Sequence, residues 1–229
     1  MMYSPEEKRF LRCQLPRLEG LVEERLRLTP ACHALDHTQR VRRAAAKLAG
    51  LEGADPLLLD YAALLHDIGR AQELADQGKT CHAELGAEIS RQILAELGIE
   101  NAGFVDAVCD CVRQHRFRRR GQAGPQSLEA KVLYDADKLD SLGAIGLARA
   151  FHFAGRIGAK VHNSAELAMN SKSYSSEDSA YREYLVKLRR LPEKMLTENG
   201  RKMGRRRLLL MQQFFDSLNL ECLGADLLD

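Results

Sequence analysis

Helix-forming residues dominate this chain, and β-branched residues are scarce. Its 229 residues include 36 Leu and 28 Ala, against 8 Val, 6 Ile and 4 Thr. Leu and Ala favour helices, whereas strands depend on β-branched and aromatic side chains, and only 6% of the residues are aromatic. The composition therefore predicts an all-α fold and disfavours a β-sandwich or a doubly wound sheet.

Apolar residues recur at helical spacing between the prolines and glycines of the chain. We expect helices at about 5–14, 17–28, 35–50, 55–67, 81–97, 102–116, 127–134, 136–155, 178–196 and 200–218. Residues 160–177 are polar and weakly periodic, which predicts a long loop or a mobile lid. We therefore expect a single α-helical domain over 1–229, with a core at about 30–155 and a C-terminal helical extension at about 178–220.

Charge and cysteine usage limit the setting in which the chain works. The formal net charge is +2, which disfavours nucleic acid or a membrane surface as its main partner. No apolar run approaches the roughly 20 residues that a membrane-spanning helix needs. Residues 1–10 lack the apolar core of a signal peptide, and the six cysteines show no repeated CxxC spacing. We therefore expect a cytoplasmic protein with reduced thiols.

Five of the apolar helical stripes carry a titratable side chain where an apolar one is expected. These side chains are His37, His66 with Asp67, His82, His115 and Asp137. Burying an unpaired carboxylate costs several kcal/mol, so Asp67 and Asp137 require cations or donors nearby. A divalent metal bound by His37, His66, Asp67 and Asp137 would satisfy all four groups. Two imidazoles and two carboxylates suit Mn, Fe, Co, Ni or Zn, whereas Mg normally takes oxygen ligands.

The motif His66-Asp67-Ile68-Gly69, with His37 before it and Asp137 after it, resembles the HDIG form of the HD-domain superfamily of metal-dependent phosphohydrolases. The segments HAELGAEI at 82–89, VRQHRFR at 112–118 and MLTENGRKMGRRR at 195–207 extend the resemblance over roughly 30–220. They resemble the small bacterial stand-alone members, some of which act on nucleotides. The resemblance implies a single-domain helical bundle whose metal ligands come from separate core helices.

The resemblance also implies an activity, namely hydrolysis of a phosphoester or phosphoanhydride bond in a nucleotide-like small molecule. The enzyme would be a nucleotide pyrophosphohydrolase or a nucleotidase that uses Mn, Fe, Co, Ni, Zn or Mg. Asp67 or a nearby histidine would take the proton of the attacking water. His82 and His115 either hold a second metal with Asp67 bridging, or contact the substrate and protonate the leaving group; the sequence favours one ion. A catalytically silent nucleotide-binding or regulatory module and a phosphodiesterase are the alternatives.

Several cationic residues near these motifs are candidates for binding substrate phosphates. They are Arg70, His115, Lys138 and Arg118, the last of which lies in the basic run 116–120. For each Arg or Lys, a solvated helix end or a local ion pair is the alternative, and Glu73 either orients a ligand or lies on the surface. Binding of nucleic acid by 116–120 together with 205–207 is disfavoured. A homodimer through the C-terminal helices would be compatible with the pattern.

Overall fold

The computed structural model describes residues 3–27, 35–116 and 124–226, which contain helices and turns and no strand. The all-α expectation is confirmed. The chain divides into two compact units, Met1–Asp137 and Lys138–Asp229, and the helix α7 (Leu128–Leu139) runs across the division. None of the described helices combines the length and apolarity needed to span a bilayer.

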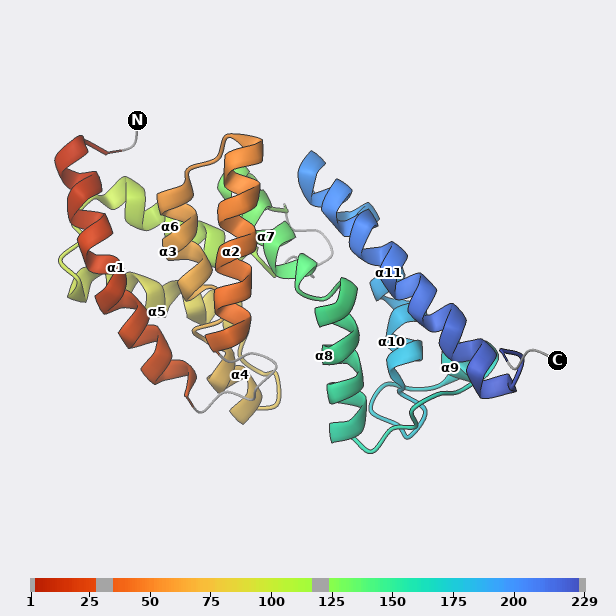
Figure 1. The fold of residues 1–229 in the computed structure, drawn as a ribbon. Coiled ribbons are helices and arrows are strands. Elements are labelled where there is room, and N and C mark those ends of the chain that lie inside the picture. The colour runs from red at the N-terminus through yellow and green to blue at the C-terminus, as the bar shows by residue number, and fades with distance from the viewer. Residues whose placement is uncertain (1–2, 28–34, 117–123, 227–229) are drawn as a thin grey trace. The chain divides into compact units, whose positions relative to one another are not determined.

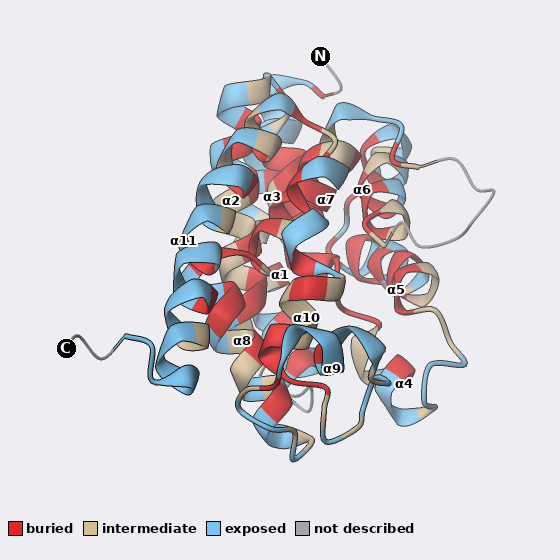
Figure 2. Cartoon of the chain, turned by 90° about the vertical axis from the view of Figure 1, so that its right-hand side faces the viewer, coloured by how far each residue is buried: buried red, intermediate tan, exposed pale blue. Residues whose placement is uncertain are grey.

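The first unit is built around α3 (Pro56–Leu65), eight of whose ten residues are buried. Its neighbours are α1 (Pro5–Leu26), α2 (Leu35–Glu52) and α6 (Ala102–Gln114), and α6 in turn pairs with α5 (His82–Glu96). Figure 1 shows α3 between α1 and α2, and Figure 2 shows α3 in the colour of buried residues. An apolar helix without a polar face is stable only in such a position. The residues that follow the C-terminal end of α3 therefore lie in the interior of the unit.

The first helix continues where the sequence predicted a break at Pro16. Proline removes one backbone hydrogen bond, because it lacks an N–H to donate to the carbonyl of Arg12. Both residues are exposed, so water can satisfy that carbonyl. Leu11, Leu18 and Val22 lie on the opposite, buried face of α1. Packing of this face stabilises a continuous helix in place of the predicted pair at 5–14 and 17–28.

The second unit contains α8 (Gly143–Arg156), α10 (Ala180–Val186) and α11 (Glu198–Leu223), together with a shorter helix described below and two short 3-10 turns, η2 (Leu188–Arg190) and η3 (Pro192–Lys194). Helix α8 packs against both α10 and α11. An aromatic cluster fills the space between them, and the buried ring of Phe215 contacts Phe151, Tyr181 and Tyr184. Aromatic pairs of this kind stabilise a small core beyond the area that they bury.

The segment expected to be a loop or a lid, 160–177, contains the short helix α9 (Ala165–Asn170). Hydrogen bonds between its two ends hold the segment in place. The Lys160 N–H donates to the Ser176 carbonyl at 2.8 Å, and the Asn163 side-chain amide donates to the Glu177 carbonyl at 2.9 Å. The segment is stabilised by these local hydrogen bonds and not by a periodic apolar face. Hydropathy alone therefore did not predict the helix.

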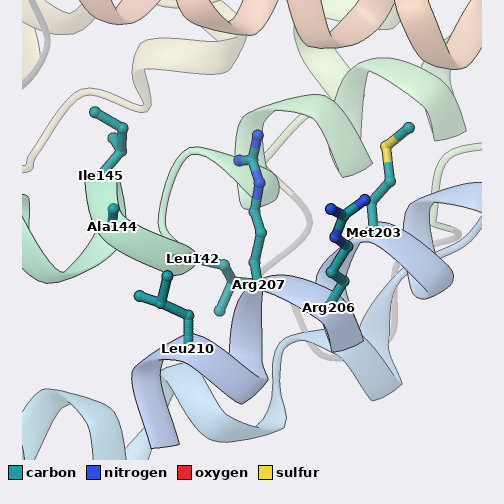
Figure 3. A pocket seen from close by; sticks show the side chains of 8 residues that line it. Leu142, Ala144, Ile145, Met203, Arg206, Arg207 and Leu210 are labelled. Carbon is teal, nitrogen blue, oxygen red and sulfur yellow. The ribbon is translucent and has the colours of Figure 1, made fainter. Parts of the chain in front are cut away.

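The break between α7 and α8 lies at 140–142 rather than at the predicted residue 135. Helix α8 starts at Gly143, whose φ is +72°, a conformation that favours glycine. A Cβ there would also lie 3.2–3.5 Å from side-chain carbons of Arg207, whose guanidinium donates to the Leu139 carbonyl. An open pocket of about 420 Å³ adjoins this turn (Figure 3), lined by Leu142, Gly143, Ala144, Ile145, Met203, Arg206, Arg207 and Leu210.

Candidate metal centre

His66 and Asp67 lie in the turn that follows α3, before the short helix α4 (Arg70–Ala75). Gly69 in this turn allows α5 to approach closely. A Cβ on Gly69 would lie 2.4 Å from the carbonyl oxygen of His82 and 2.9 Å from the backbone nitrogen of Gly86. The glycine of the His-Asp-Ile-Gly motif is therefore required by a backbone contact, and that contact places the first turn of α5 beside Asp67.

One pair of imidazoles comes from α2 and the end of α3. His66 Nδ1 lies 2.8 Å from the Ala63 carbonyl oxygen, and because a carbonyl only accepts, Nδ1 carries the proton. The lone pair of His66 Nε2 is then directed toward His37 Nε2, at 3.2 Å. The Asp67 Oδ2 atom lies 3.8 Å from both of these nitrogens, and Asp137 Oδ1 lies 3.5 Å from His37 Nε2. We call the space among these atoms the first position.

A second pair of imidazoles comes from α5 and the end of α6. His115 Nδ1 lies 2.6 Å from the Val112 carbonyl oxygen, so its proton is also on Nδ1. Its Nε2 lies 3.2 Å from His82 Nε2. The other carboxylate oxygen of Asp67, Oδ1, is 3.5 Å from His82 Nε2 and 3.6 Å from His115 Nε2. We call the space among these three residues the second position; Asp67 thus presents one oxygen to each position.

The chemistry of these groups fits divalent transition metals. The four histidines and Asp67 are buried, and each trio, His37–His66–Asp67 and Asp67–His82–His115, has its donor atoms within 4.8 Å of one another. Burial lowers the pKa of His66 to about 4, and burial with the neighbouring His115 lowers the pKa of His82 to about 3. Both rings are therefore neutral at pH 7 and can offer a lone pair. Neutral imidazoles with carboxylates are ligands typical of Mn, Fe, Co, Ni and Zn.

A layer of charged side chains surrounds the second position. Arg70 donates to Asp67 Oδ1 at 2.8 Å and to Glu73 Oε2 at 2.7 Å. Burial opposes the charge of Arg70, but the Asp67 and Glu73 carboxylates raise its pKa. Burial likewise opposes the charge of Glu73, while its hydrogen bond to His82 and the charges of Arg70 and Arg116 lower its pKa. Arg116 also donates to Glu73. The layer therefore favours the charged form of Glu73.

The structure brings His37, His66, Asp67, His82, His115 and Asp137 together at one centre. Arg70 lies at the site, but it contacts Asp67 and Glu73. Lys138 follows Asp137 on α7 and is partly exposed, and the predicted residue Arg118 lies outside the described residues.

Sequence reasoning missed the carbonyls of Ala63 and Val112, which orient His66 and His115. The available signal was positional, because each histidine follows the last turn of a helix by one residue and bonds the carbonyl three residues earlier. It also missed the contact between Arg116 and Glu73, which lie 43 residues apart in the chain.

The helical bundle, with two histidine pairs that share one aspartate, identifies the family to which the chain belongs. Residues 34–142 match the family model of the HD domain. The chain belongs to the HD-domain superfamily of hydrolases.

Particular relatives are similar over much of the chain. It is 35% identical over 196 residues to the uncharacterized protein YpgQ of Bacillus subtilis, covering 85% of this chain and 86% of YpgQ. The crystal structure of YpgQ in complex with ADP matches with a TM-score of 0.71 at 27% identity, covering 93% of this chain and 96% of that one.

A predicted HD superfamily hydrolase from an uncultured Thermotogales bacterium matches with a TM-score of 0.65 at 29% identity, covering 91% of this chain and 92% of that one. Ribonuclease Y of Aliarcobacter butzleri is 32% identical over 127 residues, which cover 55% of this chain and 22% of that protein.

Proposed function

We propose that this protein is a metal-dependent phosphohydrolase that cleaves a phosphoester or phosphoanhydride bond of a nucleotide. The observation that carries the proposal is the sharing of Asp67 between two pairs of inward-facing imidazoles. The ADP complex of YpgQ supports a nucleotide as the ligand. Divalent ions held in such a site supply electrophilic polarisation of a phosphoryl group and an acidified water nucleophile.

In this proposal the protein has two ion positions rather than the single one that the sequence favoured. His37, His66 and Asp137 would hold the first ion, and His82 and His115 the second. Asp67 would bridge them, because its Oδ2 is directed toward the first position and its Oδ1 toward the second. Two ions also explain why four imidazoles meet in two Nε2 pairs, each separated by only 3.2 Å.

The surrounding side chains have separate roles in the proposal. Arg70 orients Asp67, since its two terminal nitrogens donate to Asp67 and Glu73. Because both nitrogens already donate to carboxylates, Arg70 is a positioning residue in this proposal rather than the phosphate ligand that the sequence suggested. Lys138 remains our candidate for a phosphate contact, because it follows Asp137 directly and is partly exposed. In the alternative, His82 and His115 contact the substrate and do not bind a metal. Counting the bound metal ions distinguishes the two possibilities.

The test is turnover of a panel of nucleoside mono-, di- and triphosphates with Mn²⁺, scored separately for orthophosphate and pyrophosphate. We expect turnover by the wild type and loss of at least 10³-fold in Asp67→Ala, which removes a ligand of both ions. Asp106→Asn is the matched control, because Asp106 forms an exposed pair with Arg91 and lies outside the centre. Nucleotide binding without any turnover would refute the proposal and favour a silent binding module.

A phosphodiesterase acting on RNA is the second candidate, because 127 residues of the chain are similar to ribonuclease Y. Including a short single-stranded RNA in the same panel distinguishes the two. If the protein cleaves the RNA in preference to the nucleotides, and Asp67→Ala abolishes that cleavage, the substrate is a nucleic acid rather than a nucleotide.

A further inference from the structure

Helix α4, all six residues of which are described, buries a single side chain, and that side chain is the acidic Glu73. Leu74 beside it is 45% exposed. This reversal of the usual pattern, with the carboxylate inside and the leucine outside, requires partners for the buried charge. Glu73 has them, because its carboxylate accepts from Arg70 and Arg116 and lies 2.9 Å from His82 Nδ1.

Two groups compete for His82 Nδ1. Glu73 Oε2 lies 2.9 Å from it, and Arg116 Nη1 lies 3.1 Å from it. A carboxylate only accepts and a guanidinium only donates, so Nδ1 can bond one of them but not both. With the proton on Nδ1, His82 donates to Glu73. With the proton on Nε2 instead, Nδ1 would accept from Arg116.

The choice between these tautomers decides what the other ring nitrogen can do. His82 Nε2 is directed at the second position, 3.2 Å from His115 Nε2 and 3.5 Å from Asp67 Oδ1. A proton on Nε2 blocks its lone pair, and a histidine that lacks this lone pair cannot bind a metal through Nε2. His66 and His115 have their tautomers set by backbone carbonyls, whereas His82 has a carboxylate in that role.

We infer that Glu73 is the positioning residue of the second ion: it holds the His82 proton on Nδ1 and so makes Nε2 a ligand. This inference rests on the two-ion centre of the proposed function. The Gly69 turn and α4 bring Glu73 to α5, since α4 and α5 pack together. Arg116 neutralises the carboxylate while competing weakly for Nδ1. Outer residues of this kind typically change metal affinity 10- to 100-fold when they are removed.

The first measurement locates the His82 proton directly. Long-range ¹⁵N–¹H NMR of the full-length, metal-free protein distinguishes the two neutral tautomers, and His82→Asn assigns the resonance. We expect the proton on Nδ1 in the wild type. In Glu73→Ala, which removes the acceptor and leaves Arg116, we expect it on Nε2. A merely structural role for Glu73 would not move this proton.

The second measurement counts ions and is independent of turnover. We expect the wild type to bind two Mn²⁺ per chain and to give the electron paramagnetic resonance spectrum of a coupled pair. In Glu73→Ala we expect unchanged affinity at the first position and a 10- to 100-fold loss at the second. Glu73→Gln, whose amide oxygen can still accept from His82 Nδ1, should keep most of the affinity at the second position. Glu84→Gln is the matched control, because Glu84 lies on α5 in an exposed pair with Arg113.

Two outcomes would overturn the inference. One is a wild type that binds a single Mn²⁺; the other is a folded Glu73→Ala variant that binds the second ion as tightly as the wild type does. Failure of the proposed function looks different. A wild type that binds two ions, with weakened binding of one in Glu73→Ala, yet hydrolyses no nucleotide, would support this inference and refute the phosphohydrolase proposal.

Discussion

Replacing Gly69 by alanine tests whether a backbone contact creates the second position. The added Cβ would lie 2.4 Å from the His82 carbonyl oxygen and 2.9 Å from the Gly86 nitrogen. Both neighbours are backbone atoms of α5, so no side chain can rotate away. Opening the shorter contact to 3.0 Å, a separation below which real Cβ contacts essentially never occur, needs a displacement of at least 0.6 Å. The φ of Gly69 is −88°, so alanine brings no conformational penalty of its own.

The displacement has two expected consequences. Overpacking of a close contact costs about 1–3 kcal/mol, and for a chain of this length each kcal/mol lowers the melting temperature by roughly 2–4 °C. The same displacement moves His82 relative to Asp67 by more than the ~0.5 Å that a preorganised site tolerates. We therefore expect Gly69→Ala to melt roughly 2–12 °C lower and to lose the second Mn²⁺ while retaining the first.

The assay is thermal and urea unfolding, both followed by circular dichroism, with Mn²⁺ binding measured on the same protein. Gly20→Ala is the control, because Gly20 is exposed within α1 and a Cβ there meets nothing within 4 Å. That substitution should stabilise the protein by about 0.5–1 kcal/mol. The reasoning is refuted by a Gly69→Ala variant whose unfolding free energy and ion count both equal those of the wild type.

Three further predictions concern the stability of the first unit and its centre. Tyr61→Phe removes the buried hydrogen bond from the tyrosine hydroxyl to the Leu11 carbonyl at 2.7 Å, and we expect a loss of about 1–2 kcal/mol in urea unfolding; the exposed Tyr174→Phe should change nothing. In the metal-free protein, burial lowers the pKa of His66 from 6.5 to about 4, so between these values the unfolded chain binds a proton that the folded protein does not. Stability should be complete above pH 6.5 and fall by up to ~3 kcal/mol as the pH drops toward 4, and a flat profile over this window would contradict the burial argument. Adding Mn²⁺ at 100 times its dissociation constant should stabilise the wild type by about 2.7 kcal/mol per ion, an effect that a chelator reverses and that thermal melts of Asp67→Asn should lack.

Sequence determined much of this protein by itself. The helical periodicity and the surplus of Leu and Ala predicted an all-α fold, because the spacing of apolar residues in each helix shows which face is buried. The same pattern identified His37, His66 and Asp67 as inward-facing groups, since a titratable side chain within an apolar stripe is visible without coordinates. The glycine after the His-Asp pair was visible too, although its reason, the contact with α5, was not.

Tertiary structure decided which of these faces meet. His66 pairs with His37 across 29 residues of sequence, and His82 pairs with His115 across 33. Helical periodicity shows that a side chain points inward but not what it points at. The sequence left a second metal at His82 and His115, and a ligand-orienting Glu73, as alternatives. The geometry that favours them exists only where α5 packs against α6 and α4 packs against α5. Local order can be read from a pattern of a few residues, whereas a site built from distant segments depends on packing that no single segment contains.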